Sequence, residues 1–85
     1  RAVNADAKME LDIRGETVLD ALDAIDRFLD NAVMDHLSSV SIIHGKGTGA
    51  LRAGLTAYLQ NNRFVKKLEL ASLETGGSGA TVIDL

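Results

Sequence analysis

Residues 39–55 read SVSIIHGKGTGALRAGL, which divides into an apolar run, a glycine-rich turn and a segment with helical periodicity. Ser39 to His44 predicts a strand, because its apolar residues are β-branched and glycines follow it directly. A helix is expected from Thr48 to about Asn61, where Asn61-Asn62 favours termination because Asn tolerates the left-handed conformation past a helix end. The apolar stripe of this helix is Leu51, Leu55, Tyr58 and Leu59. A strand that passes through glycines into a helix indicates an α/β fold.

The segment before this stretch predicts another strand and a longer helix. Lys8 to Arg14 alternates strictly between polar and apolar residues, which is the period of a half-buried strand, and Gly15 ends it. The helix is expected from Thr17 to about Asp35, with Thr17 as its N-cap. Its apolar stripe is Val18, Leu19, Leu22, Ile25, Phe28, Leu29, Ala32 and Val33, and its aspartates lie mostly opposite.

Two further strands complete the expected fold. Phe64 to Ala71 and Thr81 to Leu85 are predicted strands, and Thr75 to Gly79 is the loop between them. Right-handed crossovers make the first three strands of this βαβαββ order parallel, and the last strand returns antiparallel. The fold class is therefore α/β, an α+β two-layer sandwich of four mixed strands with both helices on one face. The carboxyl ends of the first two strands and the last loop should meet at one edge, where ligands of open α/β sheets bind.

The length and composition fit one domain with an aliphatic core. The chain has 85 residues, of which 46% are hydrophobic and only 4% aromatic, so we expect one domain at residues 8–85 after a linker or disordered segment at residues 1–7. The absence of Cys excludes a disulfide framework and a thiolate metal site. Because the apolar runs are too short for a membrane span or a signal peptide, we expect a cytoplasmic protein with no membrane partner.

The net charge of −3 conceals two halves of opposite sign. Residues 9–35 contain eight acidic and two basic residues, whereas residues 36–68 contain five basic residues and no acidic one. A cationic half on an acidic protein fits contact with a polyanion, and an ordinary solvated surface fits equally well. The five cations are Lys46, Arg52, Arg63, Lys66 and Lys67.

The glycine-rich turn predicts an anion site. Its glycines allow positive φ and a close approach of the backbone to a ligand, and the helix behind them offers N–H groups. The spacing matches neither a Walker loop nor G-x-G-x-x-G, so a nucleic-acid backbone is favoured over a mononucleotide. A glycine-rich turn without a ligand is the competing interpretation. The expected phosphate-binding residues are Gly45, Lys46, Gly47, Thr48, Gly49, Arg52, Gly76, Gly77 and Gly79.

Three more side chains at this edge are candidates for catalysis. Asp12 would orient or activate a nucleophile or hold a metal, and Arg14 would bind the transferring phosphate; an ion pair between the two is the alternative. His44 would transfer a proton from a ring that reaches solvent, unless it is a structural histidine. Apart from Asp12, only Glu74 offers a carboxylate in a loop near this edge. Whether Mg²⁺ or Mn²⁺ is needed therefore stays open.

Three stretches in this order resemble the Smr (small MutS-related) domain family: LDIRG at 11–15, IHGKGTGALR at 43–52 and GGSGATV at 76–82. The resemblance covers about Met9 to Leu85 and is greatest to the C-terminal domain of bacterial MutS-II proteins. It implies a fold similar to the C-terminal domain of translation initiation factor three, with strand order 1-2-4-3 and strand 4 antiparallel. The family motif L-D-x-[RH] falls on Leu11, Asp12 and Arg14, and H-G-x-G falls on His44, Gly45 and Gly47.

The resemblance also implies a function. It implies nicking endonuclease activity on DNA and, in some relatives, cleavage of RNA on stalled ribosomes. The leading hypothesis is a nicking endonuclease domain of a MutS-like protein that acts on branched or duplex DNA in recombination control or repair, beside the ATPase domains of its parent chain. The alternatives are a non-catalytic module that binds DNA or a ribosome, and an RNA endonuclease in ribosome rescue.

Overall fold

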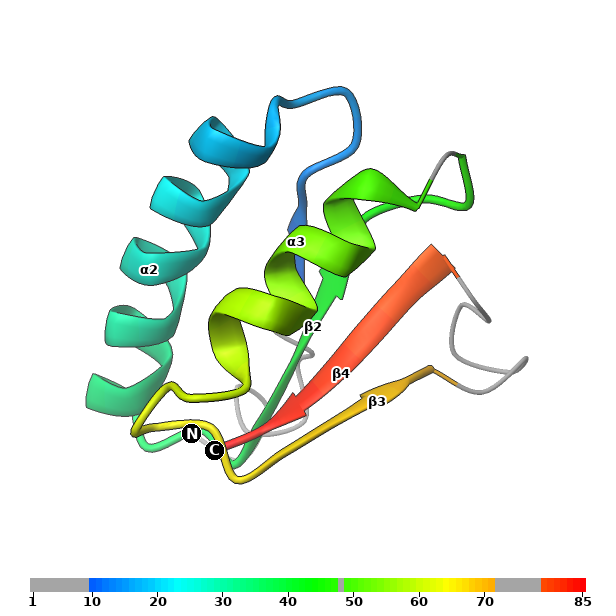
Figure 1. Cartoon of the computed structure of the whole chain (residues 1–85). Coiled ribbons are helices and arrows are strands. Elements are labelled where there is room, and N and C mark those ends of the chain that lie inside the picture. Colours follow the sequence, from blue (N-terminus) through cyan, green and yellow to red (C-terminus); the bar gives the residue numbers. More distant parts are fainter. Residues whose placement is uncertain (1–9, 48, 72–78) are drawn as a thin grey trace.

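The computed structural model describes residues 10–47, 49–71 and 79–85. The expected strand residues Lys8 and Met9, the expected linker at 1–7 and the expected loop at 75–78 lie outside this part of the chain. The predicted βαβαββ order is confirmed (Figure 1). Across the described ranges, no helix has the length and apolar character that crossing a membrane requires. The elements are β1 (Glu10–Asp12), α2 (Val18–Met34), β2 (Ser39–Ile43), α3 (Ala50–Leu59), β3 (Lys67–Leu70) and β4 (Ala80–Asp84).

The four strands form one mixed sheet in the order β1-β2-β4-β3. β1 is parallel to β2, and β4 is antiparallel to both β2 and β3, which confirms the predicted directions. In the register, Asp12 lies beside Ile43, and Ile43 lies beside Ala80. The ends of β1 and β2 and the start of β4 therefore share one edge of the sheet.

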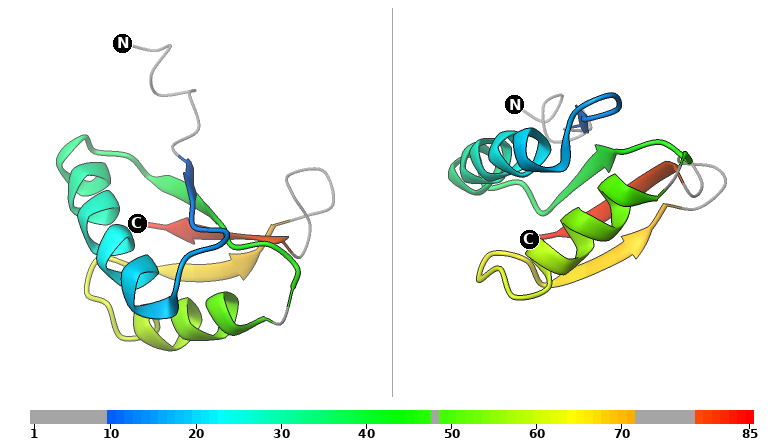
Figure 2. Two further views of the ribbon diagram at one scale, coloured as in Figure 1. Left: turned by 90° about the horizontal axis from the view of Figure 1, so that it is seen from above. Right: turned by 45° about the horizontal axis from the view of Figure 1, so that its top comes forward.

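Both helices cover the same face of the sheet, and the two layers enclose an aliphatic core (Figure 2). None of the described elements covers the opposite face. Pairing in the register places Glu10, Ser41, Val82 and Glu69 in one row across that open face. The largest fully buried side chains are Ile13, Ile25, Leu29, Ile42, Leu55, Leu59 and Ile83.

Helix α2 begins and ends at identifiable capping interactions. The backbone N–H of Asp20 donates to Thr17 Oγ1 at 3.1 Å, which confirms Thr17 as the N-cap. At the other end His36 has φ 60°, and the N–H of Leu37 donates to the carbonyl of Ala32 at 3.0 Å. This pattern is a Schellman motif with histidine at the left-handed position.

One residue of the predicted α2 stripe is misplaced. Leu19 is 79% exposed, whereas Ala21 is buried against the core. Two residues correspond to about 200° around a helix, so Leu19 and Ala21 point in nearly opposite directions. Leu19 therefore belongs to the solvent face.

The second helix and the third strand are shorter than expected. α3 ends at Leu59, and Asn61 and Asn62 do not adopt positive φ. Asn62 instead turns the chain with its side chain, because its Oδ1 accepts the backbone N–H of Phe64 at 2.8 Å. The carbonyl of Asn62 then accepts the N–H of Val65, so the chain is still turning where the strand was expected to start. β3 consequently begins at Lys67.

A hydrogen bond and a close contact fix the spacing of the two helices. Tyr58, expected in the apolar stripe, is 41% exposed, and its hydroxyl lies 2.7 Å from both carboxylate oxygens of Asp26 on α2. About one turn earlier in α3, a Cβ added at Gly54 would lie 2.8 Å from Cγ1 of Val18, the first residue of α2. That distance is too short for two carbon atoms, so the absence of a side chain at Gly54 allows the helices to approach.

We predict that Gly54→Ala destabilises the domain although alanine is the better helix former. Overpacking against Val18 should outweigh the gain in helix propensity of about 1 kcal/mol and lower the free energy of unfolding by about 1–2 kcal/mol. Urea unfolding followed by circular dichroism measures the change. In a Val18→Ala background the same substitution should cost much less, and an equal cost in both backgrounds would contradict the steric explanation.

Candidate functional site

The end of β1 carries an ion pair between two of the candidate residues. Arg14 Nη2 donates to Asp12 Oδ2 at 2.6 Å, and Arg14 Nε donates to Oδ1 at 3.0 Å. The backbone N–H of Arg14 also donates to Asp12 Oδ1 at 3.0 Å. Both side chains are exposed at the sheet edge. The mutual ion pair considered from the sequence is thus the arrangement that the structure adopts.

This pairing fixes the charge of Asp12. The side-chain hydrogen bond from Arg14, helped by the backbone N–H, lowers the pKa of the Asp12 carboxyl to about 2, and the same hydrogen bond raises the pKa of Arg14. Both carboxylate oxygens accept from Arg14. Among the described residues no group of three or more His, Asp or Glu side chains is arranged to hold a metal ion, and Glu74 lies outside them. The described residues therefore supply no metal site of their own.

The glycine-rich turn follows β2 and touches Arg14. Gly45 has φ +83°, and a Cβ placed there would lie 3.3 Å from Arg14 Cγ, so both the conformation and the contact favour glycine. Gly49 has φ +84° and is the N-cap of α3, with no side chain to cap the first turn. Gly47 does not have the positive φ that was expected of the glycines in this turn, and the position that its Cβ would take lies in open space.

His44 is buried rather than open to solvent. The ring was expected to reach solvent, but the residue is only 5% exposed. Its Nδ1 lies 2.9 Å from the carbonyl oxygen of Gly45, and its Nε2 lies 2.8 Å from Oγ1 of Thr81. The expectation failed because Thr81, which is 37 residues away in the sequence, supplies the ring with a buried partner.

Two hollows meet at this edge of the sheet. A cleft of about 580 Å³ lies on the helix side, between the β1–α2 loop and the start of α3, and Glu16, His44 and Arg52 help to line it. A second hollow of about 550 Å³ lies on the open side of the sheet, where Lys46 contributes. Arg14 and Gly45 border both hollows. Arg14 can therefore reach a ligand on either side.

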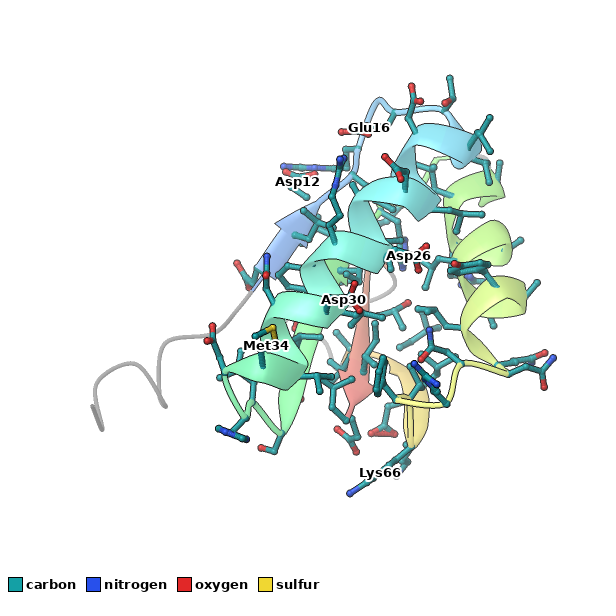
Figure 3. The ribbon with its side chains drawn as sticks, turned by 90° about the vertical axis from the view of Figure 1, so that its left-hand side faces the viewer. Asp12, Glu16, Asp26, Asp30, Met34 and Lys66 are labelled. Atoms are coloured by element: carbon teal, nitrogen blue, oxygen red, sulfur yellow. The ribbon has the colours of Figure 1, made fainter. Side chains whose placement is uncertain are left out.

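The remaining cations of the basic half lie away from this edge. Lys67 pairs in register with Asp84 at the far end of the sheet and forms an ion pair with Glu69 at 3.7 Å. Lys66 lies at the opposite end of the domain from Asp12 (Figure 3). Arg63 lies over the ring of Phe64, 5.0 Å from its centre. Of the five cations, Lys46 and Arg52 thus lie at the site.

The outward surface of α2 is acidic. Asp26 and Asp30 follow one another along this helix, with Met34 at its end (Figure 3). Arg27 forms an exposed ion pair with Asp23 at 3.1 Å. The uneven charge of the sequence thus appears in part as an uneven charge in space, with acids on α2 and Lys46 and Arg52 at the loop edge.

The structure places most of the predicted site residues at this edge and adds two that were not predicted, Glu16 and Thr81. Thr48, Gly76 and Gly77 lie outside the described residues. Glu16 was not anticipated, although its place directly after the strand-ending Gly15 was a usable signal. Thr81 was also missed, and its signal was a hydroxyl at an inward position of a buried strand. The predicted residues at this edge are Asp12, Arg14, His44, Gly45, Lys46, Gly47, Gly49, Arg52 and Gly79.

The family model described as the Smr domain matches residues 11–85. This chain belongs to the Smr domain family. Two crystal structures share the fold of this Smr domain. That of the Smr domain of Thermus thermophilus MutS2 has a TM-score of 0.87 and 39% identity, covering 89% of this chain and 95% of that chain. That of YdaL, a stand-alone small MutS-related protein from Escherichia coli, has a TM-score of 0.86 and 27% identity, covering 93% and 65%.

The Smr domain is also similar to part of a longer protein. It is 50% identical over 78 residues to a protein of Listeria monocytogenes serotype 4a named Endonuclease MutS2. The match covers 92% of this chain and 10% of that protein. The chain thus spans about a tenth of the length of the curated relatives that it matches.

We predict that Arg14→Ala raises the pKa of Asp12 from about 2 towards its ordinary value of 3.8. Because pairing depresses the folded-state pKa, it stabilises the Smr domain above about pH 4, and this stabilisation is lost as the pH falls towards 2. Carboxyl NMR titration reads the pKa, and urea unfolding between pH 2 and 5 reads the stability. Arg27→Ala, which removes another exposed ion pair, should leave Asp12 unchanged. A wild-type Asp12 that titrates near 3.8 would contradict the pairing.

Proposed function

We propose that this Smr domain binds nucleic acid and nicks a phosphodiester bond of DNA. The observation that carries the proposal is the edge where an exposed carboxylate, a guanidinium and a glycine-rich turn meet beside a cleft at the start of a helix. The name Endonuclease MutS2 of a relative at 50% identity supports the same class of reaction. So does the position of Arg14, which borders both hollows.

The phosphate would be bound by cations and by backbone N–H groups together. The planar guanidinium of Arg14 suits two phosphate oxygens, and Lys46 and Arg52 add positive charge on the two sides of the turn. The start of α3 places the positive end of its helix dipole at the cleft. Gly45 has no side chain, which leaves room for Arg14 beside the turn, and its own N–H already donates to the carbonyl of Gly79. Backbone N–H groups for the phosphate would come from Gly47, Gly49 and Gly79, and from Thr48, Gly76 and Gly77.

Binding of a phosphate would change the state of Asp12. A phosphate that takes the guanidinium of Arg14 leaves Asp12 Oδ2 without a partner, while Oδ1 keeps only the backbone N–H of Arg14. A carboxylate that has lost this partner is a stronger base and a free acceptor. It can then orient a water molecule for attack on phosphorus, while Arg14 stabilises the charge that develops on the phosphate oxygens. In this scheme the ion pair is the resting state of the site.

Proton transfer by His44 carries a structural requirement. Both ring nitrogens are hydrogen-bonded within the protein, so the ring would have to leave Thr81 or Gly45 before it could protonate a leaving group. Mg²⁺ or Mn²⁺ would find a ligand in Asp12 once Arg14 has moved, but the described residues contain no group of three or more metal-binding side chains. Nicking in the presence of Mg²⁺, Mn²⁺ or EDTA therefore tests whether the reaction needs a metal ion.

The setting of the domain follows from its relatives. Since the chain corresponds to about a tenth of the MutS2 relative, we propose that it acts beside the ATPase domains of a longer MutS-like chain in the cytoplasm. Control of recombination or repair of branched or duplex DNA is the process that suits a nicking domain in that setting.

A specific observation favours a second candidate, a non-catalytic module that binds DNA or a ribosome. Both side chains expected to do chemistry, Asp12 and His44, have their polar atoms engaged by other protein groups. A site that only binds needs the cations and the turn but neither of these groups free. Such a module would bind with a steep dependence on salt and would not cleave.

Nicking of supercoiled plasmid by the purified chain, with Mg²⁺, Mn²⁺ or EDTA, tests the proposal. Asp12→Asn and Arg14→Ala should each reduce nicking. The loss expected for Asp12 is about 10²–10⁴-fold, which is the usual contribution of a group that takes part in proton transfer. Arg27→Ala is the matched control, because it removes an exposed arginine of the acidic helix, and it should nick like the wild type.

The outcomes separate the two candidates. Loss of nicking in both site variants, with the control active, supports the nuclease, and the EDTA lanes decide the metal. Equal background cleavage by every protein, with binding of DNA by the wild type alone, favours the binding module. RNA on stalled ribosomes is then the next substrate to test.

A further inference from the structure

A buried side-chain pair joins the loop after β2 to the strand β4. His44 is 5% exposed and Thr81 is 3% exposed, and they are the two buried polar residues of the described chain. The 2.8 Å contact between Nε2 of His44 and Oγ1 of Thr81 connects them. Thr81 points inward from β4, since its register partner is the buried Ile42. The pair therefore lies inside the domain, directly behind the glycine-rich turn.

The partners of the ring determine where its protons are. The carbonyl oxygen of Gly45 can only accept, so Nδ1 of His44 carries a proton and donates it. In the neutral ring Nε2 is then an acceptor, and the hydroxyl of Thr81 donates to it. No buried side-chain nitrogen or oxygen in the described residues lacks a hydrogen-bond partner. The hydroxyl of Thr81 thus holds the ring in the orientation in which Nδ1–H meets Gly45.

The ring in turn holds the backbone that borders both hollows. The carbonyl of Gly45 accepts from His44, and the N–H of Gly45 donates to Gly79 at 2.9 Å. Both polar backbone atoms of Gly45 are therefore fixed. The side chain of Arg14 lies against this glycine, with Cγ 3.3 Å from the position that a Cβ would take. A continuous chain of contacts leads from Thr81 through His44 and Gly45 to Arg14.

We propose that Thr81 is a positioning residue of the phosphate site, which acts by holding His44 as the Nδ1–H tautomer against the carbonyl of Gly45. This role rests on the proposed function for its effect on nucleic-acid binding. It assigns His44 to shaping the turn beside Arg14 rather than to contact with the reacting atoms. Valine at position 81 keeps the shape of threonine but leaves Nε2 buried without a donor, whereas serine keeps the donor.

The test compares Thr81→Val, Thr81→Ser and the control Thr56→Val, which makes the same isosteric change on α3. Nitrogen-15 NMR of the His44 ring reports the tautomer and the exchange of Nδ1–H with water. Fluorescence anisotropy with a labelled 20-base-pair DNA duplex reports binding. Thr81→Val should lose the slowly exchanging Nδ1–H signal and bind the duplex about tenfold more weakly. Thr81→Ser and Thr56→Val should stay within about twofold of the wild type.

Several results would overturn the proposal. One is a wild-type ring protonated on Nε2, a measurement that does not depend on any variant folding. Another is a Thr81→Val protein that keeps both the protected Nδ1–H and full affinity, and a third is a Thr81→Ser protein that loses as much as the valine variant. If the wild type does not bind the duplex, the proposed function is wrong. The NMR spectra of the His44 ring would still show whether Thr81 holds His44 in place.

Discussion

The site depends on one carbonyl oxygen, that of Gly79. It accepts the backbone N–H groups of both His44 and Gly45, at 3.0 and 2.9 Å. Gly79 reaches this position because β4 is inserted antiparallel beside β2, so that the start of one strand meets the end of the other. A sheet in the order of the sequence would leave the turn after β2 without this anchor. The crossing of the strands thus creates the surface on which the glycine-rich turn is held.

Two electrostatic features act at the site. One is the Asp12–Arg14 ion pair, and the other is the uneven charge of the surfaces around it. Asp12 neutralises Arg14, so the guanidinium is held in place without an unpaired charge. Acids on the outward surface of α2 repel a polyanion, and Lys46 and Arg52 attract it at the loop edge. The net charge of the chain describes neither region. The distribution along the sequence describes them only in part, because Asp12, Arg14 and Glu16 of the acidic half lie at the loop edge, whereas Lys66 and Lys67 of the basic half lie far from it.

Local patterns in the sequence predict the elements well and their tertiary partners poorly. The N-cap Thr17 and the alternation that buries Ile13 are encoded within a few residues and were predicted. The order of the strands came from the resemblance to the Smr family, since short-range patterns carry no such information. The burial of His44 was not predicted because its partner Thr81 is 37 residues away in the sequence. Leu19 was wrongly assigned to the buried face of α2 because the predicted apolar stripe was too wide. The turn at Asn62 depends on a side-chain hydrogen bond that the prediction did not consider.

The open face of the sheet has a consequence for the direction from which ligands arrive. Its row of side chains includes Glu10 and Glu69, and the neighbouring row pairs Asp84 with Lys67, so carboxylates outnumber cations there. A phosphate backbone laid across this face would be repelled along most of its length. A duplex bound at the loop edge, as proposed, would use the hollow beside Lys46 and leave the far end of this face, at Asp84 and Lys67, uncovered.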